Sequence, residues 1–253
     1  MKKGSYKGHF CYKSEIGKVR INNEDAVKIL VNGNGNILLL AADGMGGHNK
    51  GDYASFETIR IISESFKEKR GFINSFTALR WLRNVVKIAN NSIYTLQDND
   101  VSYKGMGTTL SCALIIKNKL ILLNCGDSRV YSIENGNLNQ LTEDQTYVNF
   151  LLQSGQITKE EALVHPERHV LTNAIGLFPS ICVDTKIQNY NGEKLLLCTD
   201  GLYNNVSEKD ILNYLNANID IEDKAQSLIN LANFNGGSDN ISLCLWEPIN
   251  DKN

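Results

Sequence analysis

Short aliphatic runs bounded by turn residues recur along the chain and predict buried strands. The clearest pair, 26–31 and 37–42, flanks Asn32-Gly33-Asn34-Gly35-Asn36, a segment typical of a hairpin turn. Asn135-Gly136-Asn137 predicts a second hairpin. The remaining strands are expected at 108–116, 120–125, 130–133, 138–141, 181–187, 194–199 and 241–246.

Apolar residues repeat at helical spacing in two long segments between residues 52 and 96. The first helix is expected to begin near Asp52 and to end before Gly71, with one face formed by Phe56, Ile59, Ile62 and Phe66. The second has a stripe of Phe76, Leu79, Leu82, Val86, Ala89, Ile93 and Leu96. Two more helices are predicted at 207–215, with Ser207 as the cap, and at 221–234. Each stripe is expected to face the core.

Residues 143–170 interrupt the strands with short polar helices, expected at 144–154 and 158–163. Thr158 stands at an N-cap and Glu161 at the matching capping-box position. We expect this insertion to form a mobile flap beside a site. Hairpins mixed with helix pairs indicate an α+β fold of mainly antiparallel sheets covered by helices. Without repeats or linkers, residues 1–253 are expected to form one domain.

Composition narrows the possible function classes. The 253 residues are 42% hydrophobic and 21% charged, with a formal net charge of −2 and no basic stripe. Nucleic acid is therefore not expected as a partner, because phosphate contacts need clustered cations. The basic N-terminus is not followed by an apolar signal region, and no run is long enough to span a membrane. The six cysteines form no CxxC pair, and the position of Cys112, Cys125, Cys198 and Cys244 in apolar runs fits a reducing cytoplasm.

Aspartates stand at or just past the ends of three aliphatic runs. They are Asp43, Asp127 and Asp200, and glycine follows Asp43 and Asp200 directly. The sheet fixes the backbone at such a position, so the carboxylate points into a cleft. Glu24 precedes the first predicted strand, and Asp239 precedes the last. Carboxylates gathered in this way are suited to Mg²⁺ or Mn²⁺, which prefer oxygen ligands.

Other cofactor motifs do not match. The segment Gly44–Gly51 resembles a phosphate-binding loop, but Asn49 and Gly51 occupy the positions where the Walker pattern needs glycine and serine or threonine. No dinucleotide fingerprint follows a predicted strand. His165 and His169 are spaced as in some zinc sites, but Pro166 lies between them in a polar segment, so a surface position is favoured.

Each site residue also has a structural alternative. Arg20 lies in a polar loop and is equally well explained as a surface arginine. Glu24 alone is explained by capping the hairpin, and Asp127 by stabilising its turn. Gly46 and Gly47 are explained by positive φ. Asp43, Asp200 and Asp239 are the hardest to explain structurally and are the strongest ligand candidates.

An ordered set of motifs resembles the metal-dependent protein phosphatases of the protein phosphatase 2C type, especially their compact bacterial Ser/Thr members. The resemblance covers nearly the whole chain. Its motifs are Gly17-Lys18-Val19-Arg20, Asn23-Glu24-Asp25-Ala26, Asp43-Gly44-Met45-Gly46-Gly47-His48, Gly105-Met106-Gly107-Thr108-Thr109, Gly126-Asp127-Ser128-Arg129, His165-Pro166, Asp200-Gly201-Leu202 and Gly236-Gly237-Ser238-Asp239-Asn240.

The resemblance implies a four-layer αββα sandwich with a two-metal centre at one end. It implies that Asp43 bridges two Mn²⁺ or Mg²⁺ ions and that the Gly44 carbonyl, Asp200 and Asp239 are direct ligands. The same resemblance places Glu24 on a metal-bound water, Asp127 on a third and weaker metal, and Arg20 on the substrate phosphate.

The implied activity is hydrolysis of phosphoserine and phosphothreonine in proteins by a water that bridges the metals. The expected partners are phosphorylated proteins, plausibly the substrates of a cognate Ser/Thr kinase, and the expected state is a cytoplasmic monomer. Two alternatives stay open: a non-catalytic scaffold, and a hydrolase of small phosphoesters. Met45 stands where many animal relatives have a general-acid histidine, and we do not assign that role to His48. Gln145 and Asn173 also depart from the residues common in relatives.

Overall fold

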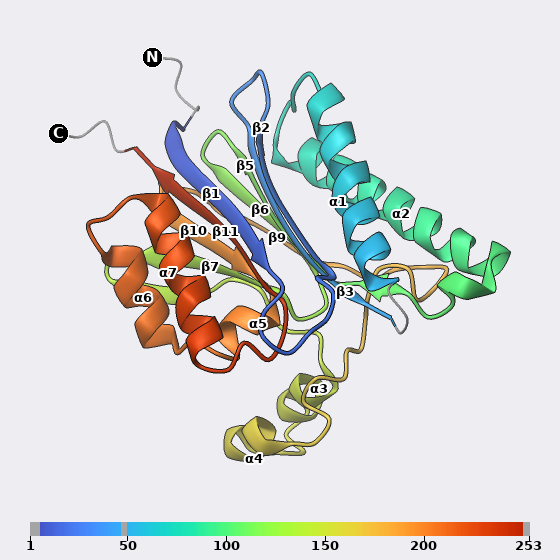
Figure 1. Cartoon of the computed structure of the whole chain (residues 1–253). Coiled ribbons are helices and arrows are strands. Elements are labelled where there is room, and N and C mark those ends of the chain that lie inside the picture. The colour runs from blue at the N-terminus through green and yellow to red at the C-terminus, as the bar shows by residue number, and fades with distance from the viewer. Residues whose placement is uncertain (1–5, 47–49, 250–253) are drawn as a thin grey trace.

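The computed structural model describes residues 6–46 and 50–249 and consists of two antiparallel sheets packed face to face between helices (Figure 1). The first sheet has the order β1-β11-β10-β7-β8, formed by β1 (Gly8–Glu15), β11 (Ile241–Pro248), β10 (Lys194–Cys198), β7 (Arg129–Glu134) and β8 (Asn137–Gln140). The second has the order β2-β3-β5-β6-β9, formed by β2 (Asp25–Val31), β3 (Ile37–Met45), β5 (Leu110–Ile116), β6 (Lys119–Cys125) and β9 (Asp184–Asn189). The short β4 (Gly107–Thr108) pairs with the end of β3.

Helices cover the outer face of each sheet. The second sheet packs against α1 (Gly51–Glu68) and α2 (Ser75–Asn99), which the 3₁₀ turn η1 (Val101–Tyr103) follows. The first sheet packs against α5 (Asp200–Tyr203), α6 (Glu208–Asn216) and α7 (Ile221–Phe234). A third apolar cluster lies between the two sheets. These layers confirm the predicted αββα sandwich.

The strand β3 shows why its apolar run is continuous. Leu38 and Leu40 belong to the cluster beneath α1 and α2, whereas Ile37 and Leu39 belong to the cluster between the sheets. Side chains alternate along a strand, so a strand covered on both faces needs apolar residues at every position. The strand continues to Met45, beyond the predicted end at residue 42, because Gly44 and Met45 pair with β4.

Several predicted elements are confirmed, and some boundaries differ. The hairpin between β2 and β3 pairs Val31 with Ile37, and α7 has the predicted bounds. Ser207 caps α6 through the Asp210 N–H. Strand β9 begins at Asp184, three residues later than predicted. The pattern did not indicate β1, an edge strand with only one buried residue, or the single-turn helix α5.

Two aromatic residues predicted to face the core are exposed. Phe56 on α1 is 63% exposed and Phe76 on α2 is 75% exposed. On α1 the small residues Ser55 and Thr58 occupy the buried face instead. The buried face of α2 begins at Ala78, one turn inside the helix, so Phe76 lies beyond it. The rest of each buried stripe follows the predicted helical spacing.

The insertion at 143–170 forms two short helices, α3 (Tyr147–Gln153) and α4 (Lys159–Val164), which lie beyond one end of the sheets (Figure 1). The predicted capping box of α4 is present, with Thr158 and Glu161 bonded reciprocally. Helix α3 starts later than predicted because Thr146 caps it by accepting from the Asn149 N–H. Among the described residues, no helix combines the length and apolarity needed to cross a bilayer.

Candidate metal centre

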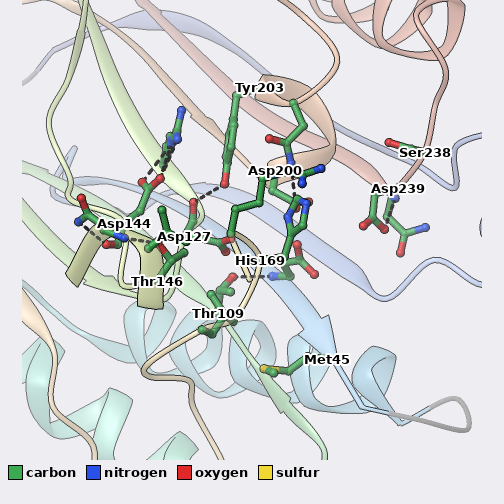
Figure 2. A pocket seen from close by; sticks show the side chains of 18 of the residues that line it. Met45, Thr109, Asp127, Asp144, Thr146, His169, Asp200, Tyr203, Ser238 and Asp239 are labelled. Atoms are coloured by element: carbon green, nitrogen blue, oxygen red, sulfur yellow. Dashed lines mark hydrogen bonds and ion pairs between the residues drawn. The ribbon is translucent and has the colours of Figure 1, made fainter. Parts of the chain in front are cut away.

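The seven residues predicted for the site all line one cleft of ≈ 1200 Å³ at the end of the sheets that faces the insertion. They come from distant parts of the chain: Arg20, Glu24, Asp43, Gly44, Asp127, Asp200 and Asp239. Figure 2 shows Asp127, Asp200 and Asp239 in this cleft, with Thr109 and Met45 below them in this view. The fold therefore brings together the carboxylates that the sequence singled out.

The position of Asp43 is fixed by backbone hydrogen bonds. Its N–H donates to Thr109 Oγ1 over 2.9 Å, and its carbonyl accepts from the Thr109 N–H, also at 2.9 Å. Thr108 Oγ1 donates to the same carbonyl oxygen. Because β3 is held on both sides, the Asp43 carboxylate has little freedom to leave the cleft.

Glycine follows Asp43 and Asp200 because another backbone lies against each position. A Cβ on Gly44 would overlap the carbonyl group of Gly51, and a Cβ on Gly201 would overlap the carbonyl oxygen of Asn240. The Asp-Gly pairs seen in the sequence therefore mark close approaches of the chain at the base of the cleft. Gly46 has a φ of +147°, so the positive φ offered above as its structural explanation is present. Gly47 lies outside the described residues.

Glu24 is held by its backbone and by the start of α1. Its N–H donates to Asn240 Oδ1 over 2.8 Å, and its carbonyl accepts from the Gly44 N–H over 3.0 Å. The Gly51 N–H donates to its carboxylate. Asn240 also donates to the carbonyls of Ile16 and Asn22, each over 2.9 Å. Asn240 thus ties the loop that carries Arg20 and Glu24 to the strand that follows Asp239.

Arg20 and Asp239 form an ion pair in the cleft. Arg20 Nη2 lies 2.7 Å from Asp239 Oδ2, and the side chains are 54% and 29% exposed. The second Asp239 oxygen accepts from the Asn240 N–H over 2.9 Å. The hydrogen bond to Asp239 raises the pKa of Arg20, so the guanidinium stays charged. Arg20 is therefore part of the site and is not an unattached surface residue.

The carboxylates in the cleft repel one another and are poorly solvated. Burial, with the nearby charges of Asp25 and Asp200, raises the pKa of Asp43 well above its ordinary value. Burial and Asp200 raise the pKa of Asp127 to about 7. Burial and Asp239 raise the pKa of Asp200 to about 6, although a hydrogen bond with Asp43 opposes this. A group of carboxylates in this condition gains stability from added positive charge.

The donor set fits hard divalent cations. Asp200 Oδ1 is buried without a hydrogen-bond partner, as is Asp25 Oδ1. In the part of the chain that the structure describes, no three Asp, Glu, His or Cys side chains are spaced as a finished metal cage. Mg²⁺ and Mn²⁺ do not require one, because they take several oxygens from water and backbone carbonyls. Uncompensated carboxylate oxygens around a wet cleft are suited to that kind of binding.

Asp25 is a site residue that the sequence reasoning did not assign. It lies opposite Asp43 in the β2–β3 register, and its Oδ2 accepts from Thr199 Oγ1 over 2.8 Å. Burial raises its pKa to about 7. The sequence signal for Asp25 was its position directly after Glu24. Side chains alternate along a strand, so only one of these two residues points toward Asp43, and the sequence did not show which.

A second group missed by the sequence reasoning links the cleft to the insertion. Arg129 donates to both oxygens of Asp144, to Oδ1 over 3.0 Å and to Oδ2 over 2.7 Å, and stacks on the Tyr203 ring at 3.6 Å. The Tyr203 hydroxyl donates to the carbonyl of Asp127 over 3.1 Å, as Figure 2 shows. No local motif marks Asp144 as the partner of Arg129 or Tyr203 as the partner of Asp127, since the fold alone brings them together.

The histidines differ in their relation to the cleft. His169 is a surface residue, as expected, but it also lines the cleft, with Nδ1 3.9 Å from Asp200 Oδ2. Burial and the Arg168 charge lower its pKa, which favours the neutral form. His48 lies outside the described residues.

Comparison with known proteins identifies the family of the chain. A family model described as Protein phosphatase 2C matches residues 17–234. The chain is 36% identical to the serine/threonine phosphatase stp of Listeria welshimeri over 94% of this chain and 95% of that protein. The structure of Stp1 from Staphylococcus aureus superposes with a TM-score of 0.91 at 34% identity, covering 99% of this chain and 98% of the other. The catalytic domain of PstP, solved in complex with two manganese ions, superposes with a TM-score of 0.84 at 33% identity, covering 96% and 99%. The chain belongs to the protein phosphatase 2C family.

Proposed function

We propose that this chain is a metal-dependent protein phosphatase that hydrolyses phosphoserine and phosphothreonine. The observation that carries the proposal is the convergence of Asp43, Asp200 and Asp239 with a charged arginine in one open cleft. Their burial and mutual repulsion favour added cations, and Arg20 offers positive charge for a phosphate. The relatives that share nearly the whole length of the chain carry the same activity in their names.

The proposed ligands are those that the sequence indicated. Asp43, the Gly44 carbonyl, Asp200 and Asp239 would hold the cations directly. Glu24 acts through water, and Asp127 serves a weaker third site. Bound Mn²⁺ or Mg²⁺ supplies a water of lowered pKa for in-line attack on phosphorus and offsets negative charge on the phosphoryl oxygens. The manganese ions of the PstP structure support this choice of metal.

Arg20 is the proposed phosphate clamp. The guanidinium carries five N–H donors, so a hydrogen bond to Asp239 leaves its fork able to contact a phosphate as well. The ion pair orients the side chain across the cleft, and its 54% exposure keeps it accessible to a substrate. Arg20 therefore both positions Asp239 and presents charge to the phosphoryl group.

The wider setting is also a proposal. We place the chain in the cytoplasm as a monomer with one catalytic domain and a flap insertion at 143–170. Its expected substrates are proteins phosphorylated by a cognate Ser/Thr kinase, so the proposed role is in signalling. Neither nucleic acid nor a membrane is expected to take part, and the net charge of −2 supports the first of these.

Hydrolysis assays test this function directly. Purified protein should release phosphate from a phosphothreonine peptide and from p-nitrophenyl phosphate in Mn²⁺ or Mg²⁺, and release should stop in EDTA. The peptide should be preferred over nucleotide and sugar phosphates in kcat/KM. Absence of metal-dependent release by folded protein would instead identify a scaffold, and preference for a small ester would identify a different phosphoesterase.

A further inference from the structure

The cleft has a second wall that the proposed metal chemistry does not use. Beside the polar residues Asn149, Arg168 and His169, this wall contains the apolar residues Val148, Leu152, Ala162, Leu163 and Leu171. They belong to α3, α4 and the segment that returns from the insertion, and they line the same cavity as Asp43 and Asp200. One continuous cleft therefore runs from a charged end, where phosphate is proposed to bind, to an apolar end on the insertion.

The apolar wall is held in place by the stems of the insertion. The Tyr147 N–H donates to the Val170 carbonyl over 2.8 Å, and the Thr172 N–H donates to the Gln145 carbonyl over 2.9 Å. Thr146 and Leu171 form an isolated bridge between the same two stems. These contacts anchor the base of α3, and the capping box anchors the start of α4. The apolar wall therefore has a fixed position and defined ends.

Leu163 is the part of this wall that is most open to solvent. It is 77% exposed although it lines the cleft, whereas its neighbour Val164 is 78% exposed and does not line it. A leucine kept in water at the edge of a cleft loses solvent-exposed apolar area only when something binds against it. Leu163 and Val164 differ in their position relative to the cleft but are almost equally exposed. Substitutions at these two positions therefore distinguish a binding role from a general effect of surface hydrophobicity.

We propose that this apolar wall, with Leu163 at its solvent-exposed edge, binds an aliphatic side chain of the phosphoprotein substrate close to the phosphorylated residue. The inference rests on the proposed phosphatase function. A volume of ≈ 1200 Å³ exceeds that of a phosphorylated serine or threonine side chain alone, and is at or above the range of ordinary small-ligand pockets. Because charged and apolar walls share one cavity, a chain segment bound through its phosphate passes the insertion. The substrate class is thus a phosphoserine or phosphothreonine segment with a nearby leucine, isoleucine, valine or methionine.

A peptide series tests the proposal. One leucine is moved through each position from three before to three after a phosphothreonine, in an otherwise Ser/Gly peptide, and kcat/KM is measured with Mn²⁺. The native protein should prefer at least one leucine position over the all-Ser/Gly peptide by about tenfold or more. Leu163→Ser should remove this preference, mainly through KM, and Leu163→Met should keep it. Val164→Ser is the matched control and should keep it as well.

The small ester p-nitrophenyl phosphate separates the two proposals. It has no peptide side chain to bind against the apolar wall, so Leu163→Ser should hydrolyse it at the native rate. If native protein hydrolyses neither the small ester nor any peptide, the phosphatase function fails. If it hydrolyses them but shows no leucine preference, or loses the preference equally in Val164→Ser, the apolar subsite is wrong. A circular dichroism spectrum matching the native one shows that each variant is folded.

Discussion

Single residues in the cleft combine several tasks. Asp239 accepts from Arg20 through one oxygen and from the Asn240 N–H through the other, so both oxygens are already oriented. Asn240 in turn bonds to the N–H of Glu24 and the carbonyls of Ile16 and Asn22. Asn240 is the chain neighbour of Asp239, whereas Arg20 reaches Asp239, and Asn240 reaches Glu24, from more than 200 residues away, so contacts across the fold fix these positions before any cation or substrate arrives.

Asp239→Asn tests the ligand assignment at this scale. The amide keeps the shape of the side chain but removes the negative charge, so we expect kcat/KM for a phosphothreonine peptide with Mn²⁺ to fall on the order of 100-fold or more. The thermal midpoint should change little because Asp239 is partly exposed. Asp223→Asn, on the exposed face of α7, is the matched control and should be native in rate. Activity within a few-fold of native in Asp239→Asn would contradict the assignment.

Whole elements are joined at the base of the insertion by charged and aromatic contacts. Arg129 on β7 binds Asp144 in the loop before α3 and stacks on Tyr203 of α5. Tyr203 reaches the Asp127 carbonyl. Gln145, next to Asp144, accepts from the Gly126 N–H and donates its own N–H to the Gly126 carbonyl, each over 3.0 Å. These contacts connect β7, α5, the insertion and the turn that carries Asp127.

Arg129→Met should destabilise the protein because it leaves the mostly buried Asp144 carboxylate without its cation. The two side chains are 21% and 17% exposed, so we expect a loss of about 2–3 kcal/mol in the free energy of unfolding, below that of a fully buried pair. Urea denaturation measures the change. The double variant Arg129→Met with Asp144→Leu should recover part of the loss. A double variant as unstable as the sum of both single variants would show that the pair is not coupled.

At the scale of the whole molecule, the two sheets and their connections bring carboxylates from distant parts of the chain to one end of the sandwich. Asp25 and Asp43 come from adjacent strands of one sheet, while Asp200 and Asp239 flank strands β10 and β11 of the other. Figure 1 shows that both sheets end on the side where α3 and α4 lie. The packing of the two sheets therefore holds like-charged carboxylates close together at the cleft, where they repel one another.

This repulsion predicts how stability depends on pH when cations are removed. The pKa values of Asp25 and Asp127 are raised to about 7 and that of Asp200 to about 6, so the folded protein holds protons that the unfolded chain releases near pH 4. The stability that these protonated carboxyl groups contribute is fully present below about pH 4 and is lost as pH rises toward about 7. In EDTA the thermal midpoint should fall by about 5–10 °C between about pH 5 and pH 7.5.

Excess Mn²⁺ should abolish most of this fall, because cations stabilise the ionised carboxylates. Differential scanning fluorimetry across the pH range measures both curves. Asp127→Asn removes one of the titrating groups and should make the fall in EDTA shallower. A midpoint that rises with pH in EDTA would show that the carboxylates are not under the repulsion described above.

Local sequence determined much of the fold. The uninterrupted aliphatic run of β3 indicated burial on both faces, the Asn/Gly segment set the hairpin, and Thr158 with Glu161 set the start of α4. The Asp-Gly pairs marked the strand ends that meet in the cleft. These features follow from interactions within a few residues of the chain, such as side-chain alternation, turn conformation and capping, so one sequence suffices to read them.

Tertiary structure alone decided which distant groups meet. The register of β2 against β3 placed Asp25 opposite Asp43, and sheet packing brought Arg129 to Asp144 and Tyr203 to Asp127. It also left Phe56 and Phe76 in solvent, because Ser55 and Thr58 occupy the buried face of α1 and the buried face of α2 begins at Ala78. Such contacts depend on strand pairing and packing between segments far apart in the chain, and no local spacing encodes them.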